Sequence, residues 1–266
     1  MDNRPIGVFD SGLGGLTAVR RLHESMPREN IIYFGDTGRV PYGTRSPETI
    51  IRYARQDVAF LRTFDLKGIV IACGTISSVA LDTLAAESDI PIIGVVWPTC
   101  AQALRETRNN RIGVIGTAST IRSGAYERML LTARPELQVF TRACPLFVPM
   151  VENGRVQRGD VVIETLVREY LSELKGQGID TLILGCTHFP LLRGVISAYL
   201  GGSVRLIDSG AAAADAARTM LTPAGSGHGH TRYFVSDDPS SFRQLAGLFL
   251  NEDIAEPAGL VEISSY

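Results

Sequence analysis

Short runs of aliphatic and β-branched residues alternate with segments of helix length along the sequence, and this alternation restricts the fold more than any other feature. Such runs are typical of strands buried on both faces of a parallel sheet. In the first part of the chain the predicted strands are Ile6–Asp10, Ile31–Gly35, Ile69–Cys73 and Ile92–Val96, and the predicted helices lie near Leu16–Ser25, Pro47–Phe64 and Ser77–Ala86. Strands that alternate with helices predict an α/β fold with mainly parallel sheets.

The same order of elements starts again near Ile112. The second set of predicted strands is Ile112–Gly116, Gln138–Thr141, Thr181–Gly185 and Val204–Ile207, with helices near Ser123–Thr132, Asp160–Lys175 and Leu191–Leu200 and a closing helix, strand and helix at Ala211–Leu221, Thr231–Val235 and Pro239–Leu250. A set of elements that repeats in this way predicts two doubly wound lobes.

Two of the predicted strands end in nearly the same way. Ile69–Cys73 and Leu182–Cys186 each finish with a small residue and a cysteine, and a threonine follows within two residues. The segment Ile6–Ser11 is likewise echoed by Ile112–Thr117. Two echoes in the same order predict a pseudo-symmetric pair of lobes. Because ligands bind beyond the carboxyl ends of parallel strands, the two thiols are expected to point into one cleft from opposite sides.

Composition and charge exclude several classes of protein. The chain of 266 residues is 45% hydrophobic and 20% charged, as is usual for a globular enzyme, and its net charge of −2 gives no sign of nucleic-acid or membrane binding. The first residues carry no apolar signal segment, and no apolar stretch reaches the roughly 20 residues of a transmembrane helix. A cytoplasmic protein is therefore expected.

The four cysteines do not form a metal or disulfide pattern. No pair has the CxxC spacing of zinc ribbons or thioredoxins, and disulfides are not expected in a reducing cytosol. Cys100 and Cys144 are predicted to be buried and structural. Cys73 and Cys186, at the ends of matching strands, are the candidates for chemistry.

Two thiols across a cleft meet the requirement of an amino-acid racemase. Racemisation removes a proton from one face of the α-carbon and delivers another to the opposite face, so two acid/base groups must flank the substrate. The pKa of a free cysteine, near ~8.5, falls beside a helix N-terminus. Cys73 and Cys186 each precede a predicted helix, so we expect lowered pKa values and general acid–base catalysis by both thiols.

Three other residues are candidates for handling protons. His188 lies two residues after Cys186, Asp10 ends the first strand, and Glu152 could orient His188. Each also has a purely structural interpretation: Asp10 could cap the following helix, and His188 and Glu152 could be ordinary hydrogen-bonded side chains. The sequence leaves these alternatives open.

The loop Gly12–Gly15 follows the first strand and opens a helix, an arrangement that presents backbone N–H groups to an anion. Asp36, at the end of the second strand, would suit a nucleotide ribose. Thr17 replaces the third glycine of the dinucleotide motif, however, and no GK[ST] sequence is present. A carboxylate is therefore the preferred anion.

Two further kinds of site are disfavoured. Pyridoxal phosphate needs a Schiff-base lysine, and the only lysines are Lys67, at the wrong end of its strand, and Lys175, at the end of a helix. No cofactor is therefore expected. His228 and His230 lie in a Gly/Ser-rich stretch and are predicted to be solvated in a surface loop, so no metal site is expected either.

A set of motifs spanning nearly the whole chain resembles the glutamate racemases of the aspartate/glutamate racemase superfamily. They are specific jointly and occur in the family's order: Phe9–Gly15, Tyr33–Asp36, Pro41–Gly43, Ala72–Thr75, Cys144–Pro149 and Leu184–Pro190. The resemblance implies a fold of two pseudo-symmetric α/β lobes in which the C-terminal segment returns to the first lobe. We accordingly expect residues 1–97 plus 209–266 to form the first lobe and residues 98–208 the second, with the active site between them.

The resemblance also implies roles for the matched residues. Cys73 would act on D-glutamate and Cys186 on L-glutamate, with Asp10, Glu152 and His188 assisting proton transfer. The substrate would be bound by Asp10, Ser11, Pro41, Tyr42, Gly43, Gly74, Thr75, Thr117, Thr120, Thr187 and His188. Members of the family need no cofactor, are often homodimers and supply D-glutamate for peptidoglycan synthesis.

One position departs from the family pattern. The family usually has Cys-Asn-Thr where this chain has Cys73-Gly74-Thr75, so the amide that contacts the substrate is missing. Losing one such hydrogen bond costs about 0.5–1.5 kcal/mol. Aspartate or another amino acid therefore stays open as the substrate. A non-catalytic two-lobed binding protein is the alternative of a different class, although a binder needs no matched thiols.

Overall fold

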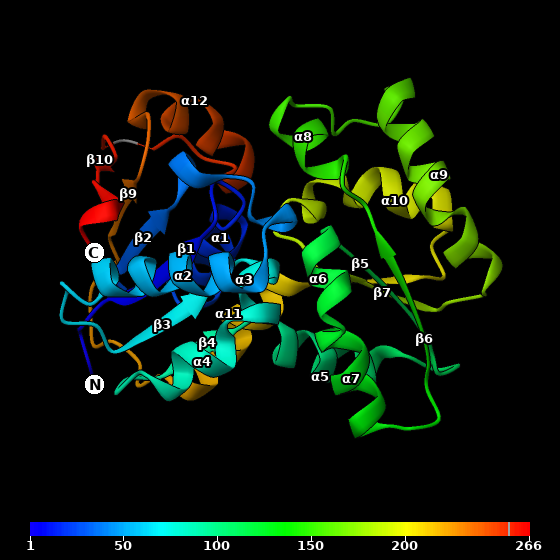
Figure 1. Ribbon diagram of the computed structural model, residues 1–266, viewed down its shortest axis with the longest axis horizontal. Coiled ribbons are helices and arrows are strands. Elements are labelled where there is room, and N and C mark those ends of the chain that lie inside the picture. Colours follow the sequence, from blue (N-terminus) through cyan, green and yellow to red (C-terminus); the bar gives the residue numbers. More distant parts are fainter. Residues whose placement is uncertain (255) are drawn as a thin grey trace.

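The protein is built on two sheets, each of parallel strands only. The computed structural model describes residues 1–254 and 256–266, and Figure 1 shows the two sheets side by side, with both termini on the side of the larger one. The strands are β1 (Ile6–Asp10), β2 (Ile31–Gly35), β3 (Gly68–Ile71), β4 (Ile92–Gly94), β5 (Arg111–Gly116), β6 (Gln138–Ala143), β7 (Thr181–Leu184), β8 (Arg205–Asp208), β9 (Thr231–Val235) and β10 (Gly259–Leu260).

The two sheets repeat one topology. The first has the order β10-β9-β2-β1-β3-β4 and the second the order β6-β5-β7-β8, so the four strands β2-β1-β3-β4 have counterparts in the same order in the second sheet. Phe9 pairs with Ile71 in the first sheet, and Ile115 pairs with Leu184 in the second. The predicted α/β class with two pseudo-symmetric, parallel lobes is therefore confirmed. The first lobe is the larger sheet with the helices that cover it, and the second lobe is the smaller sheet with its helices.

Helices cover both faces of each sheet. They are α1 (Leu16–Ser25), α2 (Pro47–Leu61), α3 (Gly74–Val79), α4 (Leu81–Ala86), α5 (Val96–Glu106), α6 (Ala118–Ser123), α7 (Ala125–Ala133), α8 (Phe147–Glu152), α9 (Val161–Gly176), α10 (Arg193–Leu200), α11 (Ser209–Met220) and α12 (Pro239–Leu250), with 3-10 turns η1 (Thr37–Arg39), η2 (Tyr42–Thr44), η3 (Phe189–Leu192) and η4 (Ile263–Ser265). None of the described helices has the length and apolar character needed to cross a membrane.

The apolar core is divided by the sheets and continues between the lobes. Successive residues of a strand point to opposite faces, so Val8 packs on the side of α1 while Phe9 packs on the side of α2. The cluster on the α1 side runs on into the second lobe, where it includes Leu184 and Phe189. Fully buried strands on both sides explain why their sequences lack polar alternation.

The C-terminal part of the chain returns to the first sheet. β9 pairs with β2, with Tyr33 opposite Tyr233, and β10 pairs with β9. The assignment of residues 209–266 to the first lobe stays a prediction. The residues at which the lobes divide, 97/98 and 208/209, stay a prediction.

Several element boundaries differ from the predicted ones. The strand predicted to reach Val96 ends at Gly94, because helix α5 begins at Val96. The helix predicted at Ser77–Ala86 is two helices that meet at Ala80, and the one predicted at Ser123–Thr132 begins earlier and is broken at Gly124, which has a φ of +65°. Glycine adopts that conformation at little cost because it has no Cβ atom. Helix α8 was not predicted.

Candidate functional site

Both candidate thiols lie where the strand order of their sheet reverses. In each lobe the second strand lies on one side of the first strand and the third strand lies on the other side. This reversal opens a crevice beyond the carboxyl ends of the strands. Cys73 stands two residues beyond the end of β3, directly before α3, and Cys186 stands two residues beyond the end of β7, shortly before η3. The repeated topology thus places the two cysteines at equivalent points.

A cavity of about 320 Å³ connects the two thiols, a size usual for a small-molecule site. It is lined by Ser11, Gly12, Val40, Pro41, Tyr42, Gly43, Thr44, Cys73, Gly74, Thr75, Thr117, Ala118, Pro145, Val148, Pro149, Glu152, Cys186, Thr187 and His188. Both thiols are nearly buried, with 5% and 6% of Cys73 and Cys186 exposed. A substrate in this cavity would have one thiol from each lobe beside it.

The side of the cavity that carries Cys73 contains a buried acid. Ser11 Oγ lies 3.5 Å from Cys73 Sγ, and Asp10 lies behind the lining with 1% of its surface exposed. Its Oδ2 accepts a hydrogen bond from the N–H of Gly12 at 3.1 Å, whereas its Oδ1 has no protein partner among the described residues. Burial raises the pKa of Asp10. A buried carboxyl oxygen without a hydrogen-bond partner destabilises the fold, so a purely structural role does not explain it. This favours a functional interpretation of Asp10.

The side that carries Cys186 contains a histidine instead. His188 Nδ1 lies 3.9 Å from Cys186 Sγ, and its Nε2 lies 3.0 Å from Glu152 Oε1. The ring is nearly buried and packs edge-on against Phe249 of α12 at a centroid distance of 5.2 Å. Glu152 is half-exposed at the end of α8 and therefore fixes the ring from the solvent side.

Three threonines join the lobes at one edge of the cavity. Thr75 Oγ1 from the first lobe lies 2.9 Å from Thr117 Oγ1 and 3.3 Å from Thr120 Oγ1 of the second. Thr117 also caps α6 by accepting from the N–H of Thr120 at 3.2 Å. Thr120 is buried behind Thr117 and does not line the cavity.

The expectation that helix N-termini lower the pKa of the thiols is wrong in this structure. Burial, together with the negative charge of Asp10, raises the pKa of Cys73 to about 12. Burial also raises the pKa of Cys186. The helix after Cys73 has six residues and that after Cys186 begins as a 3-10 turn, so neither offers the long dipole that would offset desolvation.

Most of the predicted site residues share the cavity, and several lining residues were not predicted. Asp10 and Thr120 are the two predicted residues that lie just behind the lining. The unpredicted wall is formed by Pro145, Val148 and Pro149 around the start of α8, together with Val40 and Thr44 of the first lobe. The motif Cys144–Pro149 was a signal for this wall, because a strand end followed by two prolines marks a specially shaped loop.

The comparison of this architecture with known proteins identifies its family. The model of the Asp/Glu/hydantoin racemase family matches residues 6–217. The chain belongs to this racemase family. A glutamate racemase of Geobacter metallireducens is 45% identical over 262 residues, which cover 95% of both chains. One of Neisseria meningitidis serogroup B is 45% identical over 259 residues, with 95% of both chains covered.

Solved structures of the racemase family superpose closely. A glutamate racemase isoform of Bacillus anthracis matches with a TM-score of 0.94 and 37% identity over 98% of both chains. A glutamate racemase of Francisella tularensis, solved in complex with D-glutamate, matches with a TM-score of 0.92 and 38% identity over the full length of both chains. The expected membership of this family of isomerases is confirmed.

The cavity lining of this racemase combines neutral hydrogen-bonding groups with one carboxylate, that of Glu152. Among its lining residues none is lysine or arginine. Lys67 is buried outside the cavity, where it pairs with Glu29, and Lys175 Nζ donates to the carbonyl of Tyr199 at 2.7 Å. Within the described residues there is no group of three or more metal-ligating side chains. Any anionic substrate group would therefore be held by backbone N–H groups and hydroxyls.

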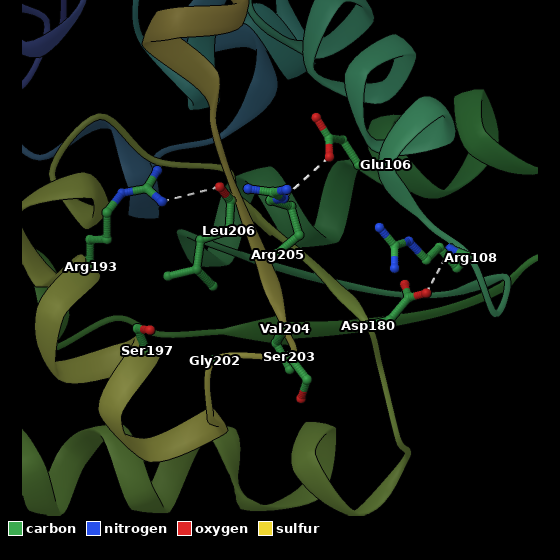
Figure 2. A pocket seen from close by; sticks show the side chains of 10 residues that line it. All are labelled: Glu106, Arg108, Asp180, Arg193, Ser197, Gly202, Ser203, Val204, Arg205 and Leu206. Carbon is green, nitrogen blue, oxygen red and sulfur yellow. Dashed lines mark hydrogen bonds and ion pairs between the residues drawn. The ribbon is translucent and has the colours of Figure 1, made fainter.

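A second hollow, of about 490 Å³, lies at the opposite end of the second sheet (Figure 2). Asp180 and Arg205 stand at the amino ends of β7 and β8, whereas the thiols stand beyond the carboxyl ends. The charged groups there bind one another: Arg205 pairs with Glu106 at 3.2 Å, and Asp180 accepts from the N–H of Arg108 at 2.7 Å. This hollow has no cysteine among its lining residues and lies apart from the cavity that the two thiols share.

Proposed function

We propose that this protein interconverts L- and D-glutamate and that Cys73 and Cys186 are its two proton carriers. The observation that carries the proposal is the placement of the two thiols at equivalent strand ends of two lobes, on one cavity. A reaction that inverts a carbon centre needs two groups on opposite faces of that centre. The pseudo-symmetry of the fold supplies such a pair.

Each turnover moves one proton off the α-carbon and another onto it. The thiolate on one side takes the α-proton, and the electron pair stays on the α-carbon, delocalised into the adjacent carboxylate. The thiol on the other side then gives its proton to the opposite face and becomes the thiolate. The enzyme thus ends each turnover with the charge on the other cysteine and is ready for the reverse direction.

Both thiols have raised pKa values, so the reactive thiolate needs a positive neighbour. The α-ammonium group of the bound amino acid supplies one inside the cavity, where the low dielectric strengthens the attraction. Asp10 beside Cys73 and the His188–Glu152 pair beside Cys186 can accept or return a proton as each thiol changes state. Substrate binding and thiol activation would therefore be coupled.

Glutamate is the proposed substrate because the relatives of similar length and more than 40% identity are named glutamate racemases, and a structure with TM-score 0.92 holds D-glutamate. The hydroxyl and backbone N–H groups of the cavity lining are the donors available to the carboxylates of such a substrate. Gly74 supplies a backbone N–H but no side chain. Aspartate, one methylene shorter, is the alternative that a racemisation assay separates from glutamate.

The wider role is part of the same proposal and rests on the resemblance to the family. The reaction would run without a cofactor, in the cytoplasm, and its D-glutamate would be used for peptidoglycan synthesis. A homodimer is the proposed assembly. Sedimentation of the purified protein at several concentrations tests the last point.

The first experiment is racemisation of L-glutamate in D₂O without any added cofactor. Optical rotation and α-deuterium content are followed for the wild type, Cys73→Ala and Cys186→Ala. Two separate carriers deliver a solvent deuteron to the product enantiomer while the remaining substrate keeps its proton early in the reaction. Each variant should lose inversion by about 10²–10⁴-fold, the usual effect of removing an acid or base.

Cys100→Ala is the matched control, because Cys100 is as buried as the two catalytic candidates but lies outside the cavity. It should leave inversion close to the wild-type rate. If the wild type inverts aspartate and not glutamate, the mechanism stands and the substrate is wrong. If no amino acid exchanges its α-proton, the enzymatic proposal fails and the cavity belongs to a binding protein.

A further inference from the structure

Two buried carboxylates lie behind the first-lobe wall of the cavity and have no part in the proposed reaction. Asp36, directly after β2, and Asp57, in α2, expose none of their surface. The hydroxyl of Tyr42 contacts both acids, and Tyr42 itself lines the cavity from η2. Because each carboxylate loses its hydration on folding, a buried pair of acids needs an explanation.

One guanidinium serves both acids. Arg39 of η1 donates from Nε to Asp36 Oδ2 at 2.6 Å and from Nη2 to Asp57 Oδ1 at 2.8 Å. Among the described residues no other cation pairs with either carboxylate. Two ionised carboxylates would therefore leave one buried negative charge unbalanced, which disfavours ionisation of the second acid. The acid cluster of Asp36, Arg39, Tyr42 and Asp57 is therefore expected to hold one proton.

The hydrogen bonds assign this proton to Asp57. Asp36 accepts from three donors, which favours its ionised form: Arg39 Nε, the Tyr42 hydroxyl and, at 2.7 Å, Ser236 Oγ. The Tyr42 hydroxyl has a single proton and gives it to Asp36, the nearer acid, so its oxygen faces Asp57 Oδ2 at 3.3 Å as an acceptor. A proton on Asp57 Oδ2 completes that contact. Burial, together with the charge of Asp36, raises the pKa of Asp57 in the same sense.

No further charged group in the described chain faces Asp57 from the elements packed against α2. Helix α3 and the turn η4 have no titratable residue, and the single acid of α4, Asp82, is exposed. Tyr33 of β2 packs on the opposite face of the sheet, and Tyr53 of α2 packs its ring against Tyr42. The remaining charged side chains of α2 are all exposed: Glu48, Arg52 and Arg55.

The acid cluster anchors a segment of the cavity wall. Residues 40–44, here called the wall segment, all line the cavity, and Arg39 directly precedes them. Within this segment, Tyr42 is the residue whose side chain reaches back to the acids. Beyond the segment, the carbonyl of Arg45 accepts from Ser119 Oγ of the second lobe at 3.3 Å. A shift of Tyr42 would therefore move a wall that is held from both sides.

We propose that Asp57 is a positioning residue: as a neutral acid it donates to the Tyr42 hydroxyl and so holds the wall segment against the cavity. Asp57 itself does not line the cavity and acts only through Tyr42. The inference rests on the proposed function, because the wall segment is a candidate for binding glutamate. Its proton, however, can be tested without any substrate.

The first test compares Asp57→Asn with Asp57→Leu. An asparagine imitates the neutral acid, since its N–H can donate to Tyr42 and its oxygen can accept from Arg39, whereas leucine makes neither bond. Asp57→Asn should therefore keep the KM for glutamate near that of the wild type. Asp57→Leu should raise KM about tenfold, the usual effect of a lost hydrogen bond, with a smaller change in kcat because the wall transfers no proton.

Urea unfolding gives a second readout that needs no substrate. Asp57 in the native state keeps a proton that the unfolded state releases above the ordinary pKa of 3.8, so the unfolding equilibrium constant should rise about tenfold per pH unit. Asp57→Asn should lack this rise between about pH 5 and pH 7, and it should be more stable than the wild type there.

Asp180→Asn is the matched contrast, because Asp180 is a charged acid far from the cavity. Burial opposes its ionisation, but hydrogen bonds, including those from the N–H groups of Arg108 and Asn109 at 2.7 Å each, lower its pKa. The same change from acid to amide should therefore make the protein less stable at pH 7, opposite to Asp57→Asn.

Two results would overturn the proposal. If Asp57→Asn raises KM as much as Asp57→Leu, or keeps the wild-type pH dependence of unfolding, Asp57 is not a neutral donor. If Asp57→Leu leaves KM unchanged, Asp57 does not hold the wall. Should Asp57→Leu fail to fold, Tyr42→Phe takes its place with the same expected rise, because it removes the hydroxyl and keeps the ring. A wild type that leaves glutamate untouched refutes the proposed function, while the urea series still decides whether Asp57 carries the proton.

Discussion

The two cysteine loops share a backbone plan but differ in the groups beside the sulfur. In the register of the two sheets, Cys73 corresponds to Cys186. Yet Asp10, the acid beside the first thiol, has Gly116 as its counterpart, and His188, beside the second, has Thr75. The repeat therefore reproduces the two proposed proton carriers, whereas the titratable side chain beside each thiol differs in kind and in position between the lobes.

This difference shows which property of the site symmetry can supply. Placing two thiols on opposite faces of one carbon requires only equivalent strand ends. The pKa of each thiol depends on its local neighbours, and these differ between the two lobes. Because L- and D-glutamate have equal free energy, kcat/KM must be equal in the two directions whatever the helpers do. Different side chains beside the two thiols can therefore change the rate constants of individual steps, but not the ratio of the two kcat/KM values.

The largest expected effect concerns the reactivity of the resting thiols. Since burial raises the pKa of Cys73 to about 12, its alkylation by iodoacetamide at about pH 7 should be about 10³-fold slower than that of a free cysteine and should rise about tenfold per pH unit up to about pH 10. Burial raises the pKa of Cys186 as well, so its alkylation should also be slow and should rise with pH. Mass spectrometry of the labelled peptides measures each site. A plateau for either cysteine near neutral pH would show that the two sides differ at rest.

Replacing Asp10 should slow only the proton transfers that involve Cys73. Asp10→Asn keeps the shape but removes the acid, and we expect kcat/KM to fall about 10²-fold in both directions, as equal free energies demand. The primary isotope effect of α-deuterated substrate should rise only in the direction in which Cys73 takes the proton. An equal rise in both directions would mean that Asp10 serves both thiols.

Glu152 should act through His188 and therefore have a smaller effect. Glu152→Gln keeps a hydrogen-bond acceptor for His188 but removes the charge, so we expect kcat to fall about tenfold with a shifted pH profile. A double-mutant cycle with His188→Asn checks the route, because Glu152→Gln should then cost nothing more. Additive losses would show that Glu152 contacts the substrate independently.

The smallest expected effect is on the pH dependence of stability. It allows Cys73, which lines the cavity, to be compared with Cys100, which lies outside it. Burial raises the pKa of Cys100 to about 12 from its ordinary 9.0. Above pH 9.0 the unfolded state releases this proton and the native state keeps it, so the free energy of unfolding falls as pH rises, by about 1.4 kcal/mol per pH unit for each such thiol.

Urea unfolding of Cys100→Ala and Cys73→Ala between about pH 9 and pH 11 measures that slope. Each variant should lose about one proton from the pH dependence shown by the wild type. Equal changes of slope would show that the two sites bury a thiol equally. No change in the Cys73 variant would mean that this thiol is not protonated in the folded protein.

The sequence predicts the frame of the site because the frame depends on local patterns. Buried strands appear as aliphatic runs, and the repeated small-residue–cysteine ending placed Cys73 and Cys186 at equivalent positions without knowledge of the contacts. The strand predicted to reach Val96 shows the limit, because β-branched residues such as Val95 and Val96 also suit a buried helix start.

Other features of the site depend on contacts between distant segments. Helix α8 has six residues and contains Pro149, so no periodicity announces it, although it carries Glu152 into the cavity wall. The raised pKa of Cys73 arises from burial by loops of both lobes, which no local sequence encodes. The approach of Gly74 to Gly185 has the same origin: the glycine is visible in the sequence, and its neighbour is not.

The return of the C-terminal segment to the first sheet has a consequence for how the protein is made. A ribosome releases β2 early, but its neighbour β9 is among the last strands to emerge. The strands of the second sheet, by contrast, leave as one uninterrupted stretch from β5 to β8. During translation the second lobe can therefore complete its sheet while the first still has an open edge at β2, which is exposed to wrong partners. The part of the nascent chain most open to wrong pairing is therefore expected in the lobe whose synthesis began first.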